Sequence, residues 1–316
     1  MFKAKLKDIK IGQIIRTNVL LIVFILLGVF FSIMSDSFFT LSNFRDVIRT
    51  NSITGLLAVG LTYVILAGGI DLSVESVTAL TGIVAGALSY NPVIAVVAGL
   101  GIGLFFGSFN GLILVKTGVQ PFIFTLAANR LIRGIILIFT KGRNIYDVNI
   151  GFTLIARSDV GVIPIPILIF VIIIGITYLM LNKAKYGRYV YSVGSNEEAA
   201  RLSGIKTKSI RVSTYVIAGF LAALAGIMLT SRVAAAETGA ATGWALDAVA
   251  AVIIGGTSLK GGHGGILNTL LGIFIIAILN NGMVLLNVPS NYYQFTKGAL
   301  IMVAVLLDMR SQNESN

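Results

Sequence analysis

The chain has 316 residues, of which 56% are hydrophobic and 12% are charged, and its formal net charge is +11. Soluble domains carry about a quarter charged residues, so this composition excludes an ordinary water-soluble protein. Apolar runs of about 20 residues recur along the chain, which is the length of a bilayer-spanning helix and too long for a barrel strand. The composition therefore predicts an all-α, polytopic integral membrane protein.

Cysteine is absent from the sequence, and His263 is the single histidine. Disulfides, thiol chemistry and cysteine-based metal sites are therefore excluded, and one histidine supplies too few ligands for a histidine-based metal site. The basic residues follow the loops instead of forming one cluster, which indicates orientation in a membrane and not a nucleic-acid partner. We expect no metal, cofactor or nucleic acid on this chain.

About ten apolar segments are expected along the chain. The eighth is short and the third is rich in small and hydroxyl residues, so we expect these two to be broken or re-entrant. All 5 prolines fall at segment edges, where a helix tolerates a missing N–H. The segments lie near residues 18–34, 51–67, 74–90, 93–115, 121–140, 163–182, 212–231, 247–257, 265–287 and 296–308.

The charges between these segments predict the orientation of the chain. If both termini are inside, the inner loops carry roughly twice as many basic residues as the outer loops, as the positive-inside rule requires. We therefore expect a basic cytoplasmic segment at 1–17, a transmembrane domain at 18–310 with a cytoplasmic loop at 183–211, and a cytoplasmic tail at 311–316. The first apolar run, Val19–Met34, lacks an obvious cleavage site and is expected to remain as a helix.

The stretch "VILAGGIDL" marks a break between two helices. Gly68 and Gly69 are expected to end one helix, and Asp71 or Ser73 could cap the next. The same stretch resembles "VIIGGTSL" at 252–259 with one gap, which indicates either an internal repeat or a chance match.

Two further glycine patterns have structural interpretations. The stretch "GGTSLKGGHGG" at 255–265 has no nucleotide-binding spacing, so it is expected to form a flexible inner turn and not a phosphate site. In the fourth segment, glycines spaced by four form one bare face that predicts close packing against another helix. These glycines are Gly99, Gly103, Gly107 and Gly111.

The fifth segment carries Asn129, Arg130 and Arg133 near its middle. A charge at the centre of a bilayer is costly and normally faces a cavity or a partner. One interpretation is a polar lining for a hydroxylated substrate. The other is structural: an ion pair with a carboxylate such as Asp71 or Asp247, or a helix that sits shallower in the membrane. We favour the structural interpretation, while Asn129 and Arg133 remain candidates for a translocation path.

Asn280 and Asn281 interrupt the ninth segment. Amides can exchange hydrogen bonds with sugar hydroxyls at little charge cost, and they can equally hold neighbouring helices together. Both interpretations stay open, and the two residues complete the candidate path. Trp244 is expected to be an interfacial anchor in preference to part of an outer gate.

The polar stretch "SNEEAARLSG" predicts a short helix in the cytoplasm. Ser195 is expected to be its N-cap, with Glu198 reaching back in a capping box. Gly204 is expected to follow its C-terminus. Such a helix is about 12 Å long and cannot span a bilayer. It is either an ordinary solvated helix or a knob that docks into a partner.

Several stretches resemble, in order, the sugar-type permeases of ATP-binding-cassette importers, in the family of ribose and branched-chain amino acid permeases. The resemblance extends from about Phe38 to Asp308. One departure is Glu75, where the family pattern usually has glycine. The stretches are "AVGLTYVILAGGIDLSVES", "PFIFTLAANRLIRGI", "YGRYVYSVGSNEEAARLSGI", "LDAVAAVIIGGTSLKGGHGGILNTLLG" and "ILNNGMVLLNVPSNYYQFTKGALIMVAVLLD".

The resemblance implies a fold like that of type II importers and a place in a bacterial cytoplasmic (inner) membrane. It also implies three partners: a second permease copy or paralogue, a cytoplasmic ATPase that holds ATP-Mg, and an external sugar-binding protein. The short polar helix would then be the coupling helix that contacts the ATPase. Its residues would be Ser195, Asn196, Glu197, Glu198, Ala199, Ala200, Arg201, Leu202 and Gly204.

The function expected is therefore import of a monosaccharide by half of a transmembrane pore. The chain has no G-x-x-x-x-G-K-[ST] loop, so the energy would come from another chain. The same machine could instead import a nucleoside, an autoinducer-type furanose or a branched-chain amino acid. An ion-gradient-driven transporter would need acidic or histidine residues at mid-membrane depth, and a membrane enzyme would need a convergent catalytic set. The sequence offers few such residues.

Overall fold

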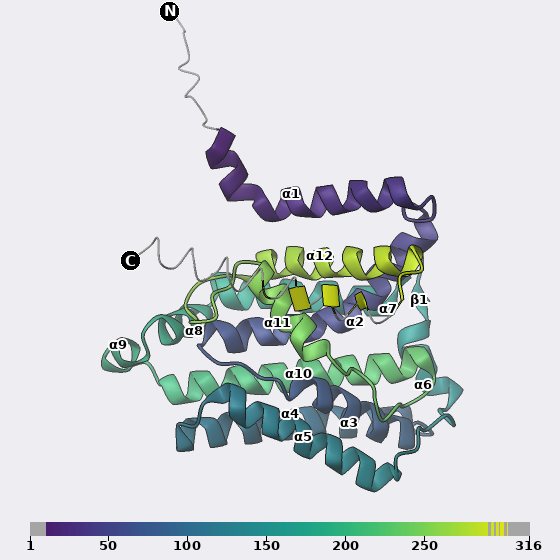
Figure 1. The fold of residues 1–316 in the computed structure, drawn as a ribbon. Helices are drawn as coiled ribbons and strands as arrows, with labels where there is room; N and C mark the ends of the chain where they lie inside the picture. Colours follow the sequence, from purple (N-terminus) through teal and green to yellow (C-terminus); the bar gives the residue numbers. More distant parts are fainter. Residues whose placement is uncertain (1–10, 290–291, 294, 297, 300–301, 303–316) are drawn as a thin grey trace, which may run out of the picture.

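The computed structural model describes residues 11–289, 292–293, 295–296, 298–299 and 302. The tenth expected segment, 296–308, lies largely outside the described residues. Within them the chain is mainly helical (Figure 1). The helices are α1 (Ile11–Met34), α2 (Leu41–Leu66), α3 (Val74–Ala87), α4 (Pro92–Thr117), α5 (Pro121–Thr140), α6 (Ile150–Arg157), α7 (Ile165–Tyr178), α8 (Lys185–Ser195), α9 (Glu197–Leu202), α10 (Thr207–Val233), α11 (Trp244–Ile254) and α12 (Ile266–Leu285).

Strand structure is limited, among the described residues, to a small hairpin. β1 (Asp159–Val160) pairs antiparallel with β2 (Ile163–Pro164) between α6 and α7. A π-helical turn at Leu179–Lys183 continues α7 towards α8. The all-α prediction therefore holds for the membrane-embedded part of the described chain.

Six of the described helices are long and apolar enough to cross a membrane: α2, α4, α5, α7 together with its π-helical turn, α10 and α12. α3 has 14 residues and α11 has 11, which give lengths of about 21 and 16 Å, against about 30 Å for the hydrocarbon core. These are the third and eighth expected segments, and the structure confirms that neither is a full-length helix.

The start of α2 and the presence of two short helices differ from expectation for local reasons. α2 begins at Leu41, well before the expected residue 51, because the Thr40 side chain accepts a hydrogen bond from the Asn43 N–H at 3.3 Å and caps the helix. α6 and α8 were not expected as helices, because both are short and only moderately apolar. α5 spans the expected residues.

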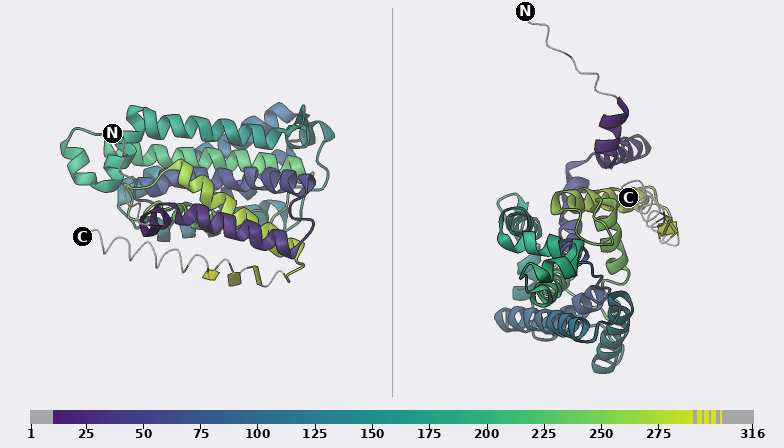
Figure 2. Two further views of the ribbon diagram at one scale, coloured as in Figure 1. Left: turned by 90° about the horizontal axis from the view of Figure 1, so that it is seen from above. Right: turned by 90° about the vertical axis from the view of Figure 1, so that its left-hand side faces the viewer.

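The centre of the bundle is formed by α2 and α10, which carry most of the fully buried side chains (Figures 1 and 2). α4 packs on α10 through its glycine face. A methyl group on Gly107 would stand 2.5 Å from the Tyr215 carbonyl oxygen, and one on Gly111 would stand 3.0 Å from Val212 Cα. Side chains larger than hydrogen are excluded there, so the predicted packing face is confirmed.

The connecting loops gather at two ends of the molecule (Figure 1). One end holds α8, α9 and the loops at 67–73 and 255–265, where the Gly262 N–H donates to the Leu66 carbonyl at 2.9 Å. The other end holds α6 and the hairpin, where Ile145 and Ala236 form an isolated bridge. Successive long helices therefore run in alternating directions, as a multi-pass chain requires.

The two similar stretches noted in the sequence end their helices in the same way. Gly68 has φ +78° and Gly256 has φ +77°. The N–H of the residue after each glycine donates to a carbonyl five residues earlier, Gly69 to Val64 and Thr257 to Val252. These are Schellman endings, which require the left-handed conformation that glycine adopts without strain.

Candidate functional site

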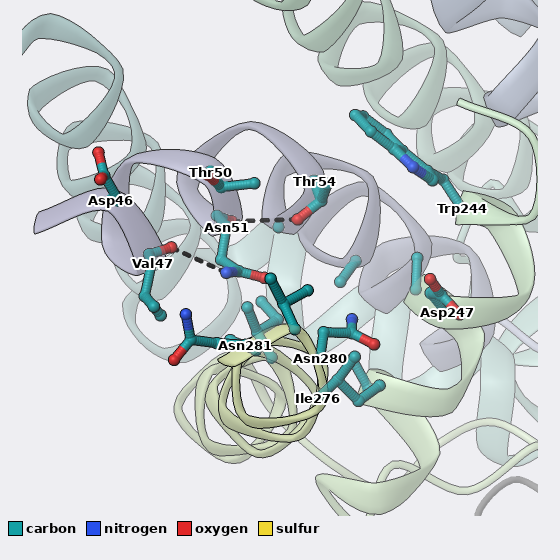
Figure 3. Close-up of a pocket in the computed structure, with 17 residues that line it drawn as sticks. Asp46, Val47, Thr50, Asn51, Thr54, Trp244, Asp247, Ile276, Asn280 and Asn281 are labelled. Carbon is teal, nitrogen blue, oxygen red and sulfur yellow. Dashed lines mark hydrogen bonds between the residues drawn. The ribbon is translucent and has the colours of Figure 1, made fainter. Parts of the chain in front are cut away.

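A cleft of about 330 Å³, lined by both polar and apolar side chains, lies between α2, α11 and α12 (Figure 3). Small-molecule sites usually have volumes of about 300–1,000 Å³, so this cleft suits a small ligand. Its wall from α2 consists of Asp46, Val47, Thr50, Asn51, Thr54, Gly55 and Ala58; α11 supplies Trp244, Asp247, Ala248 and Ala251; α12 supplies Ile273, Ile276, Ala277, Asn280, Asn281 and Val284.

The α2 wall includes a polar stripe that lies towards the N-terminal end of the helix. Asp46, Thr50 and Thr54 follow each other at intervals of four, so they share one helix face. The Asn51 amide donates to the Val47 carbonyl at 2.8 Å, which fixes its orientation (Figure 3). This stripe was missed in the sequence, although its four-residue spacing was a usable signal.

Asn280 and Asn281, two of the candidate path residues, line the cleft from α12. The Asn280 Oδ1 atom is buried and has no hydrogen-bond partner among the described residues. A buried acceptor of this kind normally has a partner, so Asn280 is an unsatisfied acceptor on the cleft wall. Asn281 exchanges two amide hydrogen bonds with Asn43, at 3.0 and 2.7 Å, and so also ties α12 to α2.

Trp244 and Asp247 line the cleft from the first turn of α11 (Figure 3). Trp244 was expected to be an interfacial anchor, but the structure places it on the cleft wall. An indole face gives a flat apolar surface, while amides, hydroxyls and carboxylates accept and donate hydrogen bonds. Together they can hold a small molecule that has one apolar face and several hydroxyl groups.

Asn129 and Arg133, the other two candidate path residues, lie outside this cleft. The Asn129 amide donates to Glu75 at 3.0 Å, and Glu75 accepts the Gly243 N–H at 2.8 Å. Arg133 donates to the carbonyls of Thr238 and Ala240. Both side chains thus support the loop at 234–243 that leads into α11.

Asp71 and Ser73 stabilise the break between α2 and α3 in a different way from the expected cap. Asp71 is 1% exposed and accepts both the Ser73 N–H, at 2.9 Å, and the Ser73 hydroxyl, at 2.6 Å. Asn110 in turn donates to the Ser73 hydroxyl at 2.8 Å. Ser73 stands at the N-cap position of α3, yet its side chain makes no capping bond to that helix. The break at Gly68 and Gly69 is confirmed, while the side-chain cap is wrong.

α9 is the short polar helix expected in the loop at 183–211, but its N-cap is Asn196 and not Ser195. Ser195 is the last residue of α8, so its side chain cannot cap the next helix. The Asn196 side chain accepts the Ala199 N–H at 2.9 Å, and asparagine is at least as good a cap as serine. Glu198 does not reach back in a capping box, because it pairs with Arg201 at 2.6 Å.

The charged side chains of α9 form ion pairs within the helix and with the start of α10. The Arg201 guanidinium lowers the pKa of the Glu198 carboxyl through its hydrogen bonds. Glu197 pairs with Arg211 at the start of α10, at 2.9 Å. The helix therefore presents an ordered set of charges at its exposed end.

The exposed surface of α9 has an apolar tip. Leu202 is 75% exposed, whereas Ala200 is 4% exposed and holds the helix to the bundle. Gly204 has φ +82° and follows the helix, and the Ile205 N–H donates to the Ala200 carbonyl, which confirms the expected C-terminal glycine. α9 projects beyond the end of the bundle (Figure 1).

No group of three or more His, Asp or Glu side chains that could hold a metal ion occurs in the described part of the chain. The alternating apolar helices, with a cleft between three of them, define a multi-pass membrane protein. Family comparison gives a more specific assignment: the chain belongs to the family described as "Branched-chain amino acid transport system / permease component", which matches residues 43–305. It is therefore a transport subunit of that family.

Characterised relatives cover nearly the whole chain. The chain is 42% identical to the ribose import permease protein RbsC of Escherichia coli K12 over 302 residues, which are 92% of this chain and 93% of the relative. It is 43% identical to the ribose import permease of Bacillus subtilis strain 168, with 90% of each chain covered. The D-allose transport system permease AlsC of Escherichia coli K12 is 35% identical over 90% of this chain and 88% of its own length. No solved structure matches the chain.

Proposed function

We propose that this chain forms half of the translocation path for a neutral, ribose-like monosaccharide, and that the cleft between α2, α11 and α12 is the part of the path that contacts the sugar. The observation that carries the proposal is the cleft's composition, an indole beside amides, hydroxyls and the orphan Asn280 acceptor. The relatives named as ribose import permeases support the choice of sugar.

The energy for import would come from a partner ATPase that binds ATP-Mg, and this chain would carry no cofactor of its own. α9 would dock into that ATPase as the coupling helix, with Glu197, Ala199 and Leu202 on its exposed surface. An external sugar-binding protein would deliver the cargo, and a second permease copy or paralogue would complete the pore. The chain would then adopt a type II importer topology of about ten spans in the cytoplasmic membrane.

The orientation proposed places α9 and both termini in the cytoplasm. Its support is the basic loop at 183–211, which lies at the same end as the loop at 255–265 (Figure 1). Membrane proteins retain lysine and arginine preferentially in cytoplasmic loops.

A branched-chain amino acid is the cargo named in the family description. Its ammonium group could pair with Asp46 or Asp247, but the described cleft lining offers no basic side chain to its carboxylate. The cleft thus favours a neutral polyol over a zwitterion.

The test is transport in sealed vesicles that contain this chain with its ATPase and receive the binding protein, labelled ribose and ATP. Uptake that occurs only when every component is present supports the proposal. Uptake by the chain alone, driven by a proton or sodium gradient, would contradict it. Asn280→Ala should lower uptake roughly tenfold, since it removes the unpaired acceptor. Asn268→Ala, on the exposed face of the same helix, should leave uptake unchanged.

A further inference from the structure

All three helices that line the cleft meet at one point at the end of the molecule that carries α9. α2 ends there at Leu66, and the loop at 255–265 joins the end of α11 to the start of α12. The Gly262 N–H donates to the Leu66 carbonyl at 2.9 Å, so this loop is hydrogen-bonded to the C-terminal end of α2.

Gly194, three residues before the first residue of α9, is in close contact with this meeting point. A methyl group on Gly194 would overlap the Leu66 carbonyl oxygen and would stand 2.6 Å from the Gly262 nitrogen. A methyl group on Gly262 would in turn stand 2.7 Å from Ser195 Cα. Real Cβ atoms do not approach other atoms so closely, because the repulsion is steep. The three backbones therefore touch directly, without side chains between them.

A side-chain bond runs across the same contact. The Tyr191 hydroxyl of α8 donates to the Gly264 carbonyl at 3.0 Å. Gly261, in the loop at 255–265, is close both to the end of α2 and to α8. A methyl group on it would stand 2.8 Å from the Gly68 nitrogen and 3.0 Å from the Gly194 oxygen. Contact by main-chain atoms leaves no rotatable side chain to absorb a displacement.

The helices that lead away from this contact reach the cleft as rigid elements. α2 is continuous from Leu41 to Leu66, so the rise from Thr54 in the cleft to Leu66 is about 18 Å along one helix. Asp247 and Trp244 lie in the first turn of α11, and the C-terminal end of this short helix leads into the loop at 255–265. A displacement of α8 at Gly194 would push on the end of α2 directly and on the loop that joins α11 to α12.

We propose that Gly194, Gly262 and the Leu66 carbonyl form a joint that transmits movement of α9 to the sugar cleft, an inference that rests on the proposed function. Gly194 and Gly262 are positioning residues, since neither lines the cleft and neither lies on α9. They are glycines because a side chain at either place would separate the coupling segment from the cleft helices.

The joint can be tested without knowledge of the cargo, because the chain has no cysteine. In the assembled complex with its ATPase, Thr54→Cys gives a single reporter on this chain, whose rate of maleimide labelling reads the opening of the cleft. ATP should change that labelling rate in the parent. Gly194→Ala should reduce the ATP-dependent change roughly tenfold, within the usual range of coupling between sites, while ATP hydrolysis continues.

Two control variants separate the joint from general effects of adding a methyl group. Gly175→Ala changes a helical glycine on α7 with open space around it, and Gly142→Ala changes a loop glycine with φ +71° and open space. Gly142 matches Gly262, whose φ is +72°. Both controls should keep the ATP-dependent change, whereas Gly262→Ala should lose it. An unchanged response in Gly194→Ala and Gly262→Ala would overturn the proposal.

A milder variant covers the case in which the glycine variants fail to assemble. Tyr191→Phe removes one hydrogen bond across the joint and should weaken the ATP-dependent change a few-fold. Tyr189→Phe alters a 40% exposed tyrosine on the same helix and should not. Equal responses in these two variants would also contradict the joint. A further outcome is that the unsubstituted chain takes up no ribose while the labelling rate of the Thr54→Cys reporter still responds to ATP and this response is still weakened by Tyr191→Phe. That outcome would reject ribose as the cargo and would leave the proposed joint supported.

Discussion

Gly101 and Gly103 lie two residues apart on α4, yet only Gly103 meets another helix. A methyl group on Gly103 would overlap the Gly219 carbonyl oxygen of α10, whereas one on Gly101 would have nothing within 4 Å. Substitution of Gly101 therefore reports the intrinsic effect of glycine on helix stability, whereas substitution of Gly103 also reports the packing of α4 against α10.

We expect Gly103→Ala to destabilise the protein by about 1–3 kcal/mol, the usual cost of overpacking. Gly101→Ala should leave stability unchanged or raise it by up to about 1 kcal/mol, because alanine is the better helix former. Thermal unfolding in detergent measures both. Equal destabilisation by the two substitutions would contradict the close contact of α4 with α10.

Spacing along the chain was enough to predict this glycine face, but not which neighbouring residue caps a helix. Ser195 and Asn196 are both good caps. The choice between them depends on where α8 ends, and α8 was not recognised because its apolar face is short. The role of Glu75 could not be predicted either, since its partners Asn129 and Gly243 come from two distant segments.

The loop at 234–243 and the start of α11 form an element that depends on side chains from α3 and α5. Glu75 accepts the N–H groups of Gly243, at 2.8 Å, and Ala245, at 3.3 Å. Arg133 donates to two carbonyls of the same loop. Because unpaired backbone groups are costly inside a membrane, these two side chains fix where α11 begins and so where Trp244 lies.

We expect Glu75→Ala to reduce the rate of ribose uptake roughly tenfold and to lower stability by about 1–3 kcal/mol, the cost of leaving backbone donors unpaired. The Asn91 side chain caps α4 by accepting the Ile94 N–H at 3.2 Å, and Asn91 does not line the cleft. Asn91→Ala is therefore the matched control. It should cost about 0.5–2 kcal/mol of stability without a comparable loss of uptake at a temperature where both variants are folded. Uptake and unfolding are measured on the same preparations.

Helices with long apolar runs were predicted well, because hydropathy reports burial in lipid directly. α5 has the expected bounds. α6 was missed because it has only 8 residues, and the start of α2 was missed because "LSNFRDVIRTN" is polar. That polar start is part of the cleft wall, so the segment failed the hydropathy test for the same reason that it suits a substrate.

At the scale of the whole molecule, the two ends differ in what they expose. One end presents α9, with the charges of Glu197 and Arg201 around the apolar tip at Leu202. The other end carries α6 and the hairpin, where Arg45 pairs with Asp159. The cleft lies between them, formed by α2, α11 and α12. No single segment contains it, so the sequence could nominate Asn280 and Asn281 but not the complete wall.

We expect Ala199→Glu to block docking of the ATPase, because it places a third carboxylate beside Glu197 and Glu198 on an exposed face. Co-purification with the ATPase should fall by about a hundredfold or more, since an unpaired charge that is desolvated in an interface costs several kcal/mol. Gln120→Glu adds the same charge to an exposed residue between α4 and α5 and should not affect co-purification. A stable complex with Ala199→Glu would show that α9 is not the docking element.

The packing of α10 has a consequence for the order of synthesis. α10 fills the centre between α2, α3 and α4, yet it ends at Val233, after most of the chain has left the ribosome. Until then the glycine face of α4 has no helix to meet, and Thr78 lacks the Ala222 carbonyl to which it donates at 3.0 Å. The early helices therefore lack their central partner in the bilayer until α10 has been made, so their final packing can form only after synthesis of residues 207–233.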